Sequence, residues 1–384
     1  MTAGVPLSPV LEGLRTYPFV RLTQAARRLR EEGVDVIDFG VGEPREPAPA
    51  FIREALAAAI TPQSPYPLAE GLPELREAVA AWAARRFGAA LDPATQIVPT
   101  LGSKELIFGL VQVLGPGKVA VTTPGYPVAE RGALFADREV VELPLTAGRG
   151  FLPDLGALPD GLALLWLNYP NNPTAATADV AFYEQAAALA RERGFVLASD
   201  EAYSELSFTG ALPQSALQLA DLTNVVVVNT LSKRSSMPGL RSGFAAGDPH
   251  LIGALKRYRP NVGVAPQEFV QRAAVAAWGD EDHVVAVREV YRAKRDVLLP
   301  ALLAAGLRPA GGDATFFLWL ALPAGWTSSE AFALALLEQG LVVAPGAFFG
   351  PAGEGYVRVA LVPTLERCAV AAERLRAWTP PAPV

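Results

Sequence analysis

One lysine of this chain stands where a protein can do chemistry on a carbonyl compound. Lys233 follows residues 224–229, an apolar run of the kind that forms a buried strand. An amine at the end of such a strand is partly desolvated, which favours the neutral form that attacks an aldehyde. Eight residues further on, Arg241 could bind a phosphate by two parallel hydrogen bonds. The hydroxyls of Thr230 and Ser232 could donate further hydrogen bonds to the same phosphate. An exposed basic loop is the alternative interpretation.

A carboxylate ends the preceding apolar run. Asp200 closes residues 195–200 and is followed by Glu201, Ala202 and Tyr203. A carboxylate in this place could keep a pyridine nitrogen protonated, and the protonated ring would be the electron sink for a substrate carbanion. Tyr203 could donate a hydrogen bond to a ring oxygen. A helix N-cap is the alternative role of Asp200.

Two turns add further polar groups. Residues 168–174 read Asn-Tyr-Pro-Asn-Asn-Pro-Thr, a rigid turn that could present the amide of Asn172 to the same ring oxygen. Residues 102–104, Gly-Ser-Lys, join a predicted strand to a predicted helix, where backbone N–H groups can bind a phosphate. Lys104 rivals Lys233 as the reactive amine, but the first turn of a helix is usually solvated, which favours Lys233. Ordinary turns are the alternative for both segments.

One arginine stands inside an apolar run near the C-terminus. Arg358 belongs to residues 356–361, which are predicted to form a strand. An arginine in such a strand normally faces a partner, and its planar fork matches the α-carboxylate of a substrate. An outward-facing strand residue is the alternative interpretation.

The composition argues against several kinds of site. The single cysteine, Cys368, cannot form an internal disulfide, and His250 and His283 lie too far apart for metal-ligand spacing, so no metal site is expected. The net charge of −6 includes no block of like charges, so neither nucleic-acid binding nor membrane binding is expected. We find no signal peptide and no apolar stretch of about 18 residues, and therefore expect a cytoplasmic protein.

Short apolar runs alternate with helical stretches in the middle of the chain. Seven runs are predicted as strands, at residues 97–101, 118–122, 139–143, 162–168, 195–200, 224–230 and 241–247. Helical stretches lie between them, at residues 103–114, 126–136 and 180–193. Several runs are apolar nearly throughout, which a sheet covered on both faces requires. The sequence therefore predicts an α/β fold with a mostly parallel seven-stranded sheet.

The pattern changes near residue 275. A long helix is predicted first, at 282–305, followed by strands at 315–320, 341–344 and 356–361 and helices at 328–339 and 365–377. The first part of the chain holds a predicted helix, 20–32, and a short strand, 36–39. We predict a large α/β domain over residues 45–275 and a smaller α+β domain formed by residues 1–44 together with 276–384.

The motifs follow one another in a specific order. Along the chain they are Gly42, Tyr66, Gly102-Ser103-Lys104, Tyr126, Asn172-Pro173-Thr174, Asp200 to Tyr203, Ser232-Lys233, Arg241 and Arg358. This order resembles that of the class I and II aminotransferases of the aspartate aminotransferase fold, from about residue 35 to residue 375. The resemblance implies the type I fold of pyridoxal-phosphate-dependent transferases, with pyridoxal 5'-phosphate as the cofactor.

The resemblance also implies roles at the cofactor ring. Lys233 would hold the cofactor as an internal Schiff base and later shuttle a proton at the substrate α-carbon. Asp200 would pair with the pyridine nitrogen, and Tyr203 and Asn172 would bond the ring oxygen. Tyr126 would stack on the face of the ring.

Further roles concern the phosphate, the substrate and a partner subunit. By the same resemblance, the phosphate would be held by a backbone segment and three side chains, namely Gly102, Ser103 and Lys104 with Thr230, Ser232 and Arg241. Arg358 would bind the substrate α-carboxylate, with Asn172 beside it and backbone help from Gly42. Tyr66 would reach the phosphate in the partner subunit of a homodimer.

Two segments make the resemblance more particular. Residues 230–241 and 168–174 are similar to those of bacterial N-succinyldiaminopimelate aminotransferases, although Ala175 stands where that family usually has glycine. The resemblance implies a ping-pong transfer of an amino group from glutamate to N-succinyl-2-amino-6-ketopimelate, in lysine and diaminopimelate biosynthesis. A doubly acidic substrate would need a further cation, and three candidates are Arg234, Arg15 and Arg21.

Other functions stay open at this point. A class I or II aminotransferase with a different keto acid would hold the cofactor in the same way, and so would a pyridoxal-phosphate-dependent carbon–sulfur lyase. An aminotransferase-like ligand sensor of a transcription regulator would need an attached DNA-binding module. No basic helix-turn-helix segment fits before residue 20.

Overall fold

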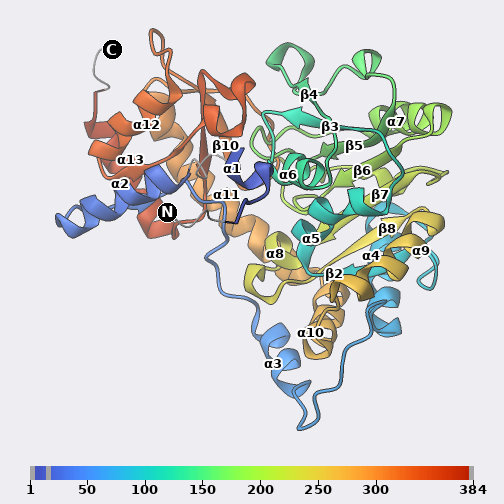
Figure 1. Cartoon of the computed structure of the whole chain (residues 1–384). Coiled ribbons are helices and arrows are strands. Elements are labelled where there is room, and N and C mark those ends of the chain that lie inside the picture. Colours follow the sequence, from blue (N-terminus) through green and yellow to red (C-terminus); the bar gives the residue numbers. More distant parts are fainter. Residues whose placement is uncertain (1–4, 14–18, 380–384) are drawn as a thin grey trace.

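A seven-stranded sheet forms the centre of the larger lobe (Figure 1). The computed structural model describes residues 5–13 and 19–379, with side chains from residue 23 onward in the second range. The strand order is β2-β8-β7-β6-β5-β3-β4. These strands are β2 (Ile97–Thr100), β3 (Lys118–Thr123), β4 (Val140–Pro144), β5 (Leu162–Asn168), β6 (Val196–Asp200), β7 (Val225–Thr230) and β8 (Gly243–Gly247). Neighbouring strands are parallel, except that β8 runs antiparallel to both β2 and β7.

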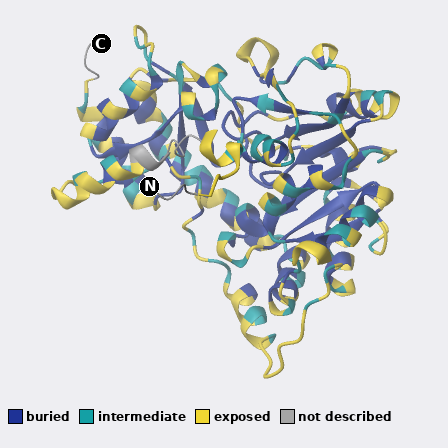
Figure 2. Ribbon diagram, viewed as in Figure 1, coloured by how far each residue is buried: buried dark blue, intermediate teal, exposed yellow. Residues whose placement is uncertain are grey.

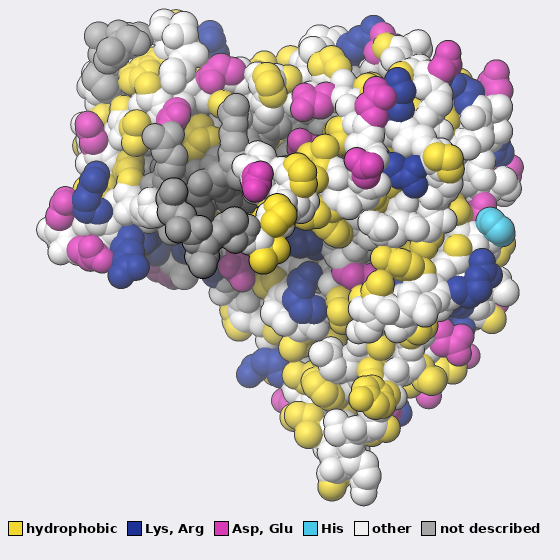
Figure 3. Space-filling model, in the orientation of Figure 1, with side chains coloured by type: hydrophobic (Ala, Val, Ile, Leu, Met, Phe, Trp, Pro, Cys, Tyr) yellow, Lys and Arg dark blue, Asp and Glu magenta, His cyan; other side chains and the backbone are white. Residues whose placement is uncertain are grey.

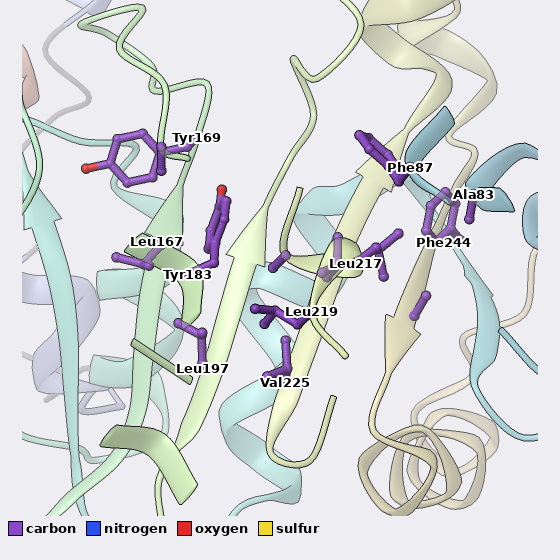
Figure 4. Close-up of a cluster of buried hydrophobic side chains, with 14 of the residues drawn as sticks. Ala83, Phe87, Leu167, Tyr169, Tyr183, Leu197, Leu217, Leu219, Val225 and Phe244 are labelled. Carbon is purple, nitrogen blue, oxygen red and sulfur yellow. The ribbon is translucent and has the colours of Figure 1, made fainter. Parts of the chain in front are cut away.

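The sheet is buried on both faces. In β5, Leu165 and Leu167 belong to one hydrophobic cluster, whereas Leu164 and Trp166 belong to another. Successive side chains of a strand point to opposite faces, so each cluster covers one face of the sheet. Figure 4 shows part of the first cluster, and the strands are dark blue in Figure 2. This double burial explains why the strands are almost wholly apolar.

Helices cover the two faces. The face of the first cluster is packed by α3 (Ala50–Ala58), α4 (Pro73–Phe87), α7 (Val180–Arg193) and α10 (Glu268–Gly279). The opposite face is packed by α5 (Gly102–Gly109), α6 (Val128–Phe135) and α9 (Pro249–Tyr258). A short helix, α8 (Leu231–Arg234), follows β7 directly. In α/β sheets with helices on both faces, ligands bind at the carboxyl ends of the parallel strands. In this sheet, those of the central strands β5, β6 and β7 are the places to look for functional side chains.

The smaller lobe lies to one side of the sheet and is coloured orange and red in Figure 1. Its antiparallel sheet has the order β12-β13-β10-β9, and β1 pairs with β11 in parallel. These strands are β1 (Ile37–Asp38), β9 (Arg308–Pro309), β10 (Phe317–Ala321), β11 (Leu341–Val342), β12 (Ala344–Pro345) and β13 (Tyr356–Ala360). Its helices are α2 (Phe19–Glu31), α11 (Asp282–Ala304), α12 (Ser329–Glu338) and α13 (Leu365–Ala377), and α1 (Pro9–Gly13) precedes α2 in the chain. A separate hydrophobic cluster joins α11, α12 and α13 to this sheet.

The predicted fold class is confirmed, with corrections of detail. The strand predicted over 241–247 begins only at Gly243, because Arg241 adopts a left-handed backbone conformation with φ +50°. The helix predicted over 103–114 ends at Gly109, and a 3-10 turn, Leu110–Val113, continues it. The domain boundaries near residues 45 and 275 stay a prediction. Over residues 5–13 and 19–379, no helix combines the length and apolar character needed to span a bilayer.

Candidate active site

A cavity of about 880 Å³ opens at the carboxyl ends of β3, β5 and β6, beside the smaller lobe. Eight of the residues predicted from the sequence line it: Gly42, Ser103, Tyr126, Asn172, Asp200, Tyr203, Lys233 and Arg358. They come from segments that are far apart in the chain. The fold therefore brings most of the predicted site residues to one place, where parallel strands end.

Lys233 points its amine into this cavity from α8. The Nζ atom donates a hydrogen bond to the Gly42 carbonyl oxygen at 2.9 Å and lies 5.7 Å from the centroid of the Tyr203 ring. Burial, together with the positive charge of Arg358, lowers the pKa of Lys233 to about 8. A substantial fraction of this amine is therefore neutral and nucleophilic near pH 8.

Asp200 ends β6 and is buried beside the same cavity. Within the described residues, its carboxylate accepts one hydrogen bond, from the backbone N–H of Ala202 at 3.2 Å. Burial raises the pKa of Asp200 to about 7, although the charge of Lys233 opposes the shift. A cation placed against this carboxylate would restore its ionised form. Tyr203 follows it, and its ring meets Phe317 edge to face at 5.4 Å between centroids.

Arg358 is buried in β13 and is held from several sides. Its Nη1 donates to Asn172 Oδ1 at 2.8 Å, and its Nη2 donates to the Gly40 carbonyl oxygen at 2.6 Å. The guanidinium carbon lies 4.3 Å from the ring centroid of Phe317 and 4.7 Å from that of Phe349. Two aromatic faces and two hydrogen bonds fix the orientation of this fork, which suits recognition of a carboxylate.

The loops after β2 and before β8 meet at the edge of the cavity. Gly102 adopts φ +70°, and a Cβ atom at this position would lie 2.6 Å from Arg241 Nη2. Arg241 donates from Nη2 to the Leu101 carbonyl oxygen at 3.2 Å. Only glycine therefore allows the start of α5 to approach this guanidinium so closely. Backbone N–H groups and a guanidinium in one place form a cradle for an anion.

Hydroxyl groups stand next to this cradle. Thr230 Oγ1 and Ser232 Oγ lie 2.9 Å apart, and Thr230 Oγ1 donates to the Ser242 carbonyl oxygen at 2.9 Å. Lys104 is exposed on the first turn of α5, with its Nζ 5.8 Å from the centroid of the Tyr126 ring. Lys104 does not line the cavity, whereas Lys233 does.

Comparison with known proteins identifies the family. A family model described as aminotransferase class I and II matches residues 34–375. The chain belongs to the class I and II aminotransferases. This aminotransferase is 39% identical over 377 residues to LL-diaminopimelate aminotransferase 2 of Nostoc sp., covering 95% of this chain and 97% of the relative. An LL-diaminopimelate aminotransferase of Moorella thermoacetica is also 39% identical, over 94% of this chain and 96% of its own.

Two solved structures from Thermus thermophilus have the same fold as this aminotransferase. A single mutant of aspartate aminotransferase superposes with a TM-score of 0.89 at 30% identity, covering 97% of this chain and 100% of the other. A probable N-succinyldiaminopimelate aminotransferase superposes with a TM-score of 0.84 at 34% identity, covering 94% of this chain and 99% of the other. The predicted aspartate aminotransferase fold is thereby confirmed.

Class I and II aminotransferases depend on pyridoxal phosphate, and the residues of this member fit that group. A partly neutral lysine amine faces the cavity, as bonding to an aldehyde requires. The buried Asp200 carboxyl has a raised pKa that a cationic ring nitrogen would lower again. The space left by the missing side chain of Gly102 lies against Arg241, where a phosphate would be held.

Other predicted residues lie away from the cavity of this aminotransferase. Arg234, proposed for a distal carboxylate, is buried and pairs with Glu281 Oε1 at 2.9 Å, so that proposal is wrong for this side chain. Tyr66 is fully exposed in the segment between α3 and α4. Arg15 lies outside the described residues, and so does the side chain of Arg21.

Four charged residues of the cavity wall escaped the sequence analysis, and one of them, Glu43, follows Gly42 directly. Glu130 and Arg131 lie on α6, and Glu142 lies on β4. Burial and the neighbouring Glu142 raise the pKa of Glu130, whereas Arg131 opposes the shift. Glu142 lies far from every predicted motif, whereas Glu130 and Arg131 follow Tyr126 within two turns of the predicted helix and could have been found by that spacing. This wall of the cavity therefore carries charges of both signs.

Proposed function

We propose that this aminotransferase acts on acids with the seven-carbon diaminopimelate skeleton, and that LL-diaminopimelate is its preferred amino donor. The observation that carries the proposal is the charge pattern of the cavity, with Arg358 and Glu43 near Lys233 and with Glu130, Arg131 and Glu142 on α6 and β4. The high identity to LL-diaminopimelate aminotransferases over nearly the whole chain supports it.

The charge pattern matches a substrate that is an amino acid at both ends. Arg358 would bind the α-carboxylate of the reacting end. At the other end, the ammonium would meet Glu130 and Glu142, and the second carboxylate would meet Arg131. An N-succinyl group would replace this ammonium by a neutral amide, for which two glutamates offer no charge complement.

A second candidate keeps the substrate predicted from the sequence. N-succinyl-2-amino-6-ketopimelate, with glutamate as the amino donor, is supported by the 34% identity to the probable N-succinyldiaminopimelate aminotransferase of Thermus thermophilus. In this case Arg131 would bind one of the extra carboxylates, replacing the excluded candidate Arg234. The two candidates share the seven-carbon skeleton and differ in the charge at the distal nitrogen.

Four residues of the chain would act at the cofactor ring and at the substrate α-carbon. Bound pyridoxal phosphate supplies an aldehyde for the amine and a ring that withdraws electrons from the substrate α-carbon. Lys233 would bind the aldehyde group of the cofactor, and its Nζ would move the proton at the substrate α-carbon. Asp200 would keep a proton on the ring nitrogen. Tyr203 and Asn172 would donate to the ring oxygen, with the amide of Asn172 oriented by Arg358.

Other residues hold and shield the cofactor. The start of α5, from Gly102 to Lys104, would bind the phosphate through its backbone, together with Thr230, Ser232 and Arg241. Tyr126 would pack against the ring and exclude water from it. Gly42 stands at the substrate side, where its carbonyl oxygen already accepts the hydrogen bond from Lys233.

A homodimer would complete the site through Tyr66. Around α3, apolar side chains gather at the narrow end of the molecule (Figure 3). Exposed members of this surface are Phe51, Ile60, Tyr66, Leu68, Val262 and Phe269. Burying these side chains against a second copy would favour association, and Tyr66 would then reach the phosphate in the partner.

A substrate comparison tests the proposal. The purified enzyme is given LL-diaminopimelate with 2-oxoglutarate, and separately glutamate with N-succinyl-2-amino-6-ketopimelate, oxaloacetate, pyruvate or an aromatic keto acid. We expect the highest kcat/KM for LL-diaminopimelate, and a selective loss of that activity in Glu130→Gln. Faster turnover of oxaloacetate, pyruvate or the aromatic acid than of both seven-carbon substrates would reject the proposal.

A further inference from the structure

The two residues that follow Lys233 tie its helix to the junction between α10 and α11. Arg234 Nη1 donates to the Ala277 carbonyl oxygen at 3.0 Å, and its Nη2 donates to Glu281 Oε1 at 2.9 Å. Ser235 Oγ lies 2.9 Å from His283 Nε2. All three contacts span more than forty positions of the sequence, so they fix the lysine segment to a distant part of the chain.

Ser235, His283 and Asp280 form a chain of hydrogen bonds, called the relay below. His283 Nδ1 lies 2.6 Å from Asp280 Oδ1, which also accepts the His283 backbone N–H at 3.0 Å. Burial lowers the pKa of His283, and the backbone hydrogen bond from His283 lowers the pKa of Asp280. The neutral imidazole therefore donates from Nδ1 to an ionised carboxylate, and Nε2 is left to accept the Ser235 hydroxyl.

This order of groups is also found in serine hydrolases, but the burial here excludes their chemistry. Ser235 is fully buried, and His283 is 8% exposed. A substrate cannot reach the serine oxygen, and a nucleophile must be reached to act. The relay therefore serves to hold something in place. Its nearest functional group is Lys233, two residues before Ser235 in the chain.

The other end of the relay belongs to the helix that builds the smaller lobe. His283 stands in the first turn of α11, and further along that helix Tyr291, Leu298 and Leu302 enter the hydrophobic cluster of the smaller lobe. This lobe carries Arg358, the carboxylate-binding arginine. The relay is thus a direct polar link between the lysine segment and the lobe that binds the substrate.

We propose that Ser235, His283 and Asp280 are positioning residues, which hold Lys233 in the orientation that its proton transfer needs. The proposal rests on the proposed role of Lys233, and it extends that role to groups that never touch the substrate. Proton transfer is sensitive to small displacements of the amine, whereas a covalent bond to the cofactor can form from a wider range of positions. Loss of the relay should therefore slow turnover more than it reduces cofactor content.

The surroundings of the relay define its controls. The charged groups packed near it are Arg234, Glu281 and Glu205, and the ring of Phe51 meets the imidazole edge to face at 5.6 Å. Arg234 is left unchanged in the test because it also packs on Trp278 at 4.5 Å. His250 offers a matched control, since its backbone N–H also bonds an aspartate, Asp248, at the start of a helix, but its side chain is exposed.

Variants at position 283 separate the two ends of the relay. Glutamine can keep a hydrogen-bond acceptor where Nε2 stood, so His283→Gln should keep the bond to Ser235. Asparagine is shorter and can only replace Nδ1, so His283→Asn should lose that bond. Ser235→Ala removes it from the other side. His250→Asn is the control that should leave every measurement unchanged.

Three measurements decide the proposal. The first is the pH at which the absorbance of the lysine-bound cofactor changes. The second is the pair of kinetic constants kcat and KM, measured with an α-deuterated amino acid. The third is the rate of amide hydrogen exchange of residues 231–236 in the cofactor-free chain. For Ser235→Ala and His283→Asn we expect kcat to fall about tenfold, with a larger isotope effect, a shifted absorbance pH and faster exchange. KM should change less than about twofold. The effects of His283→Gln should be smaller than those of His283→Asn, because glutamine keeps the bond to Ser235 and loses only the bond to Asp280.

A second set of results would overturn the proposal. If Ser235→Ala and His283→Asn lower the melting temperature but leave the isotope effect, the absorbance pH and kcat at wild-type values, the relay is only structural and the proposal is overturned. Glutamate serves as the amino donor in this test. A failure of LL-diaminopimelate as substrate would therefore reject the proposed substrate and still leave the relay to be judged.

Discussion

The guanidinium of Arg358 donates to Asn172 Oδ1 at 2.8 Å, although 186 positions of sequence separate the two residues. The contact joins the smaller lobe to the turn after β5. It orients the Asn172 amide, whose oxygen is occupied by Arg358, so that its nitrogen is the end left to donate to a ligand. In the proposed function, one arginine would thus order a cofactor contact and a substrate contact together.

Replacing Arg358 should therefore weaken the binding of amino acids selectively. Arg358→Gln removes a buried charge from a carboxylate site, which typically costs about 3 kcal/mol, or roughly a 100-fold rise in KM. Arg358→Lys should recover little, because an ammonium lacks the planar fork. Steady-state kinetics with glutamate measure the effect, and Arg292→Gln, which breaks the surface ion pair with Glu289, is the control. An unchanged KM would exclude Arg358 from the carboxylate site.

Replacing Lys233 should abolish covalent attachment of the cofactor. After borohydride reduction, mass spectrometry of the wild type should find the pyridoxyl label on the peptide that contains Lys233. Lys233→Ala should carry no label and should lose turnover by several orders of magnitude. Lys118→Ala, which removes the exposed ion pair with Glu139, should be labelled like the wild type. A label on Lys104 would shift the reactive amine to the start of α5.

Attachment of the cofactor should depend on pH with a midpoint near the pKa of Lys233, about 8. The amine reacts when neutral, and its pKa is depressed, so the rate for the cofactor-free enzyme should rise as the pH increases through this value and level off above it. Arg358→Gln removes a positive charge that lowers this pKa, so its profile should move to higher pH. Stopped-flow absorbance records the rate. A profile that stays in place would mean that Arg358 does not tune the amine.

A methyl group at Gly102 should damage the phosphate cradle. Gly102→Ala places Cβ 2.6 Å from Arg241 Nη2 at a φ of +70°. The left-handed conformation alone costs about 1–2 kcal/mol, and displacement of the guanidinium should weaken cofactor binding about tenfold. Gly109→Ala, in the same helix, meets nothing within 4 Å and should bind the cofactor normally. Equilibrium titration with pyridoxal phosphate compares the two, and equal affinities would contradict the proposed cradle.

The sequence predicts those parts of the fold that a local pattern determines. The strands β5 and β7 are apolar nearly throughout, and in an α/β chain such runs indicate strands of a sheet that is covered on both faces. The antiparallel direction of β8 leaves no mark on its residues, because strands of either direction can be apolar. Helices α4 and α10 were not predicted. In α4, arginines are mixed with apolar residues around the circumference, so the sequence shows no clear apolar stripe.

The same distinction applies to the site. Lys233 and Asp200 were found because each is a charged residue directly after an apolar run, which is a local signal. Glu142 and Arg131 enter the cavity only through the packing of α6 against β3 and β4, and no spacing along the chain predicts that. Arg234 was one of three arginines considered for a further substrate carboxylate, whereas tertiary packing places it against Trp278 and Glu281.

The long-range contacts of the site bear on how the protein matures. Arg358 bonds the Gly40 carbonyl oxygen across 318 positions, and Lys233 bonds that of Gly42 across 191. Contacts between residues so far apart form late in folding, because closing large loops costs entropy before it is repaid. A chain that lacks β13 thus holds no finished pocket. Retention of the vitamin-derived group should therefore require that Arg358 and residues 40–42 are in place together.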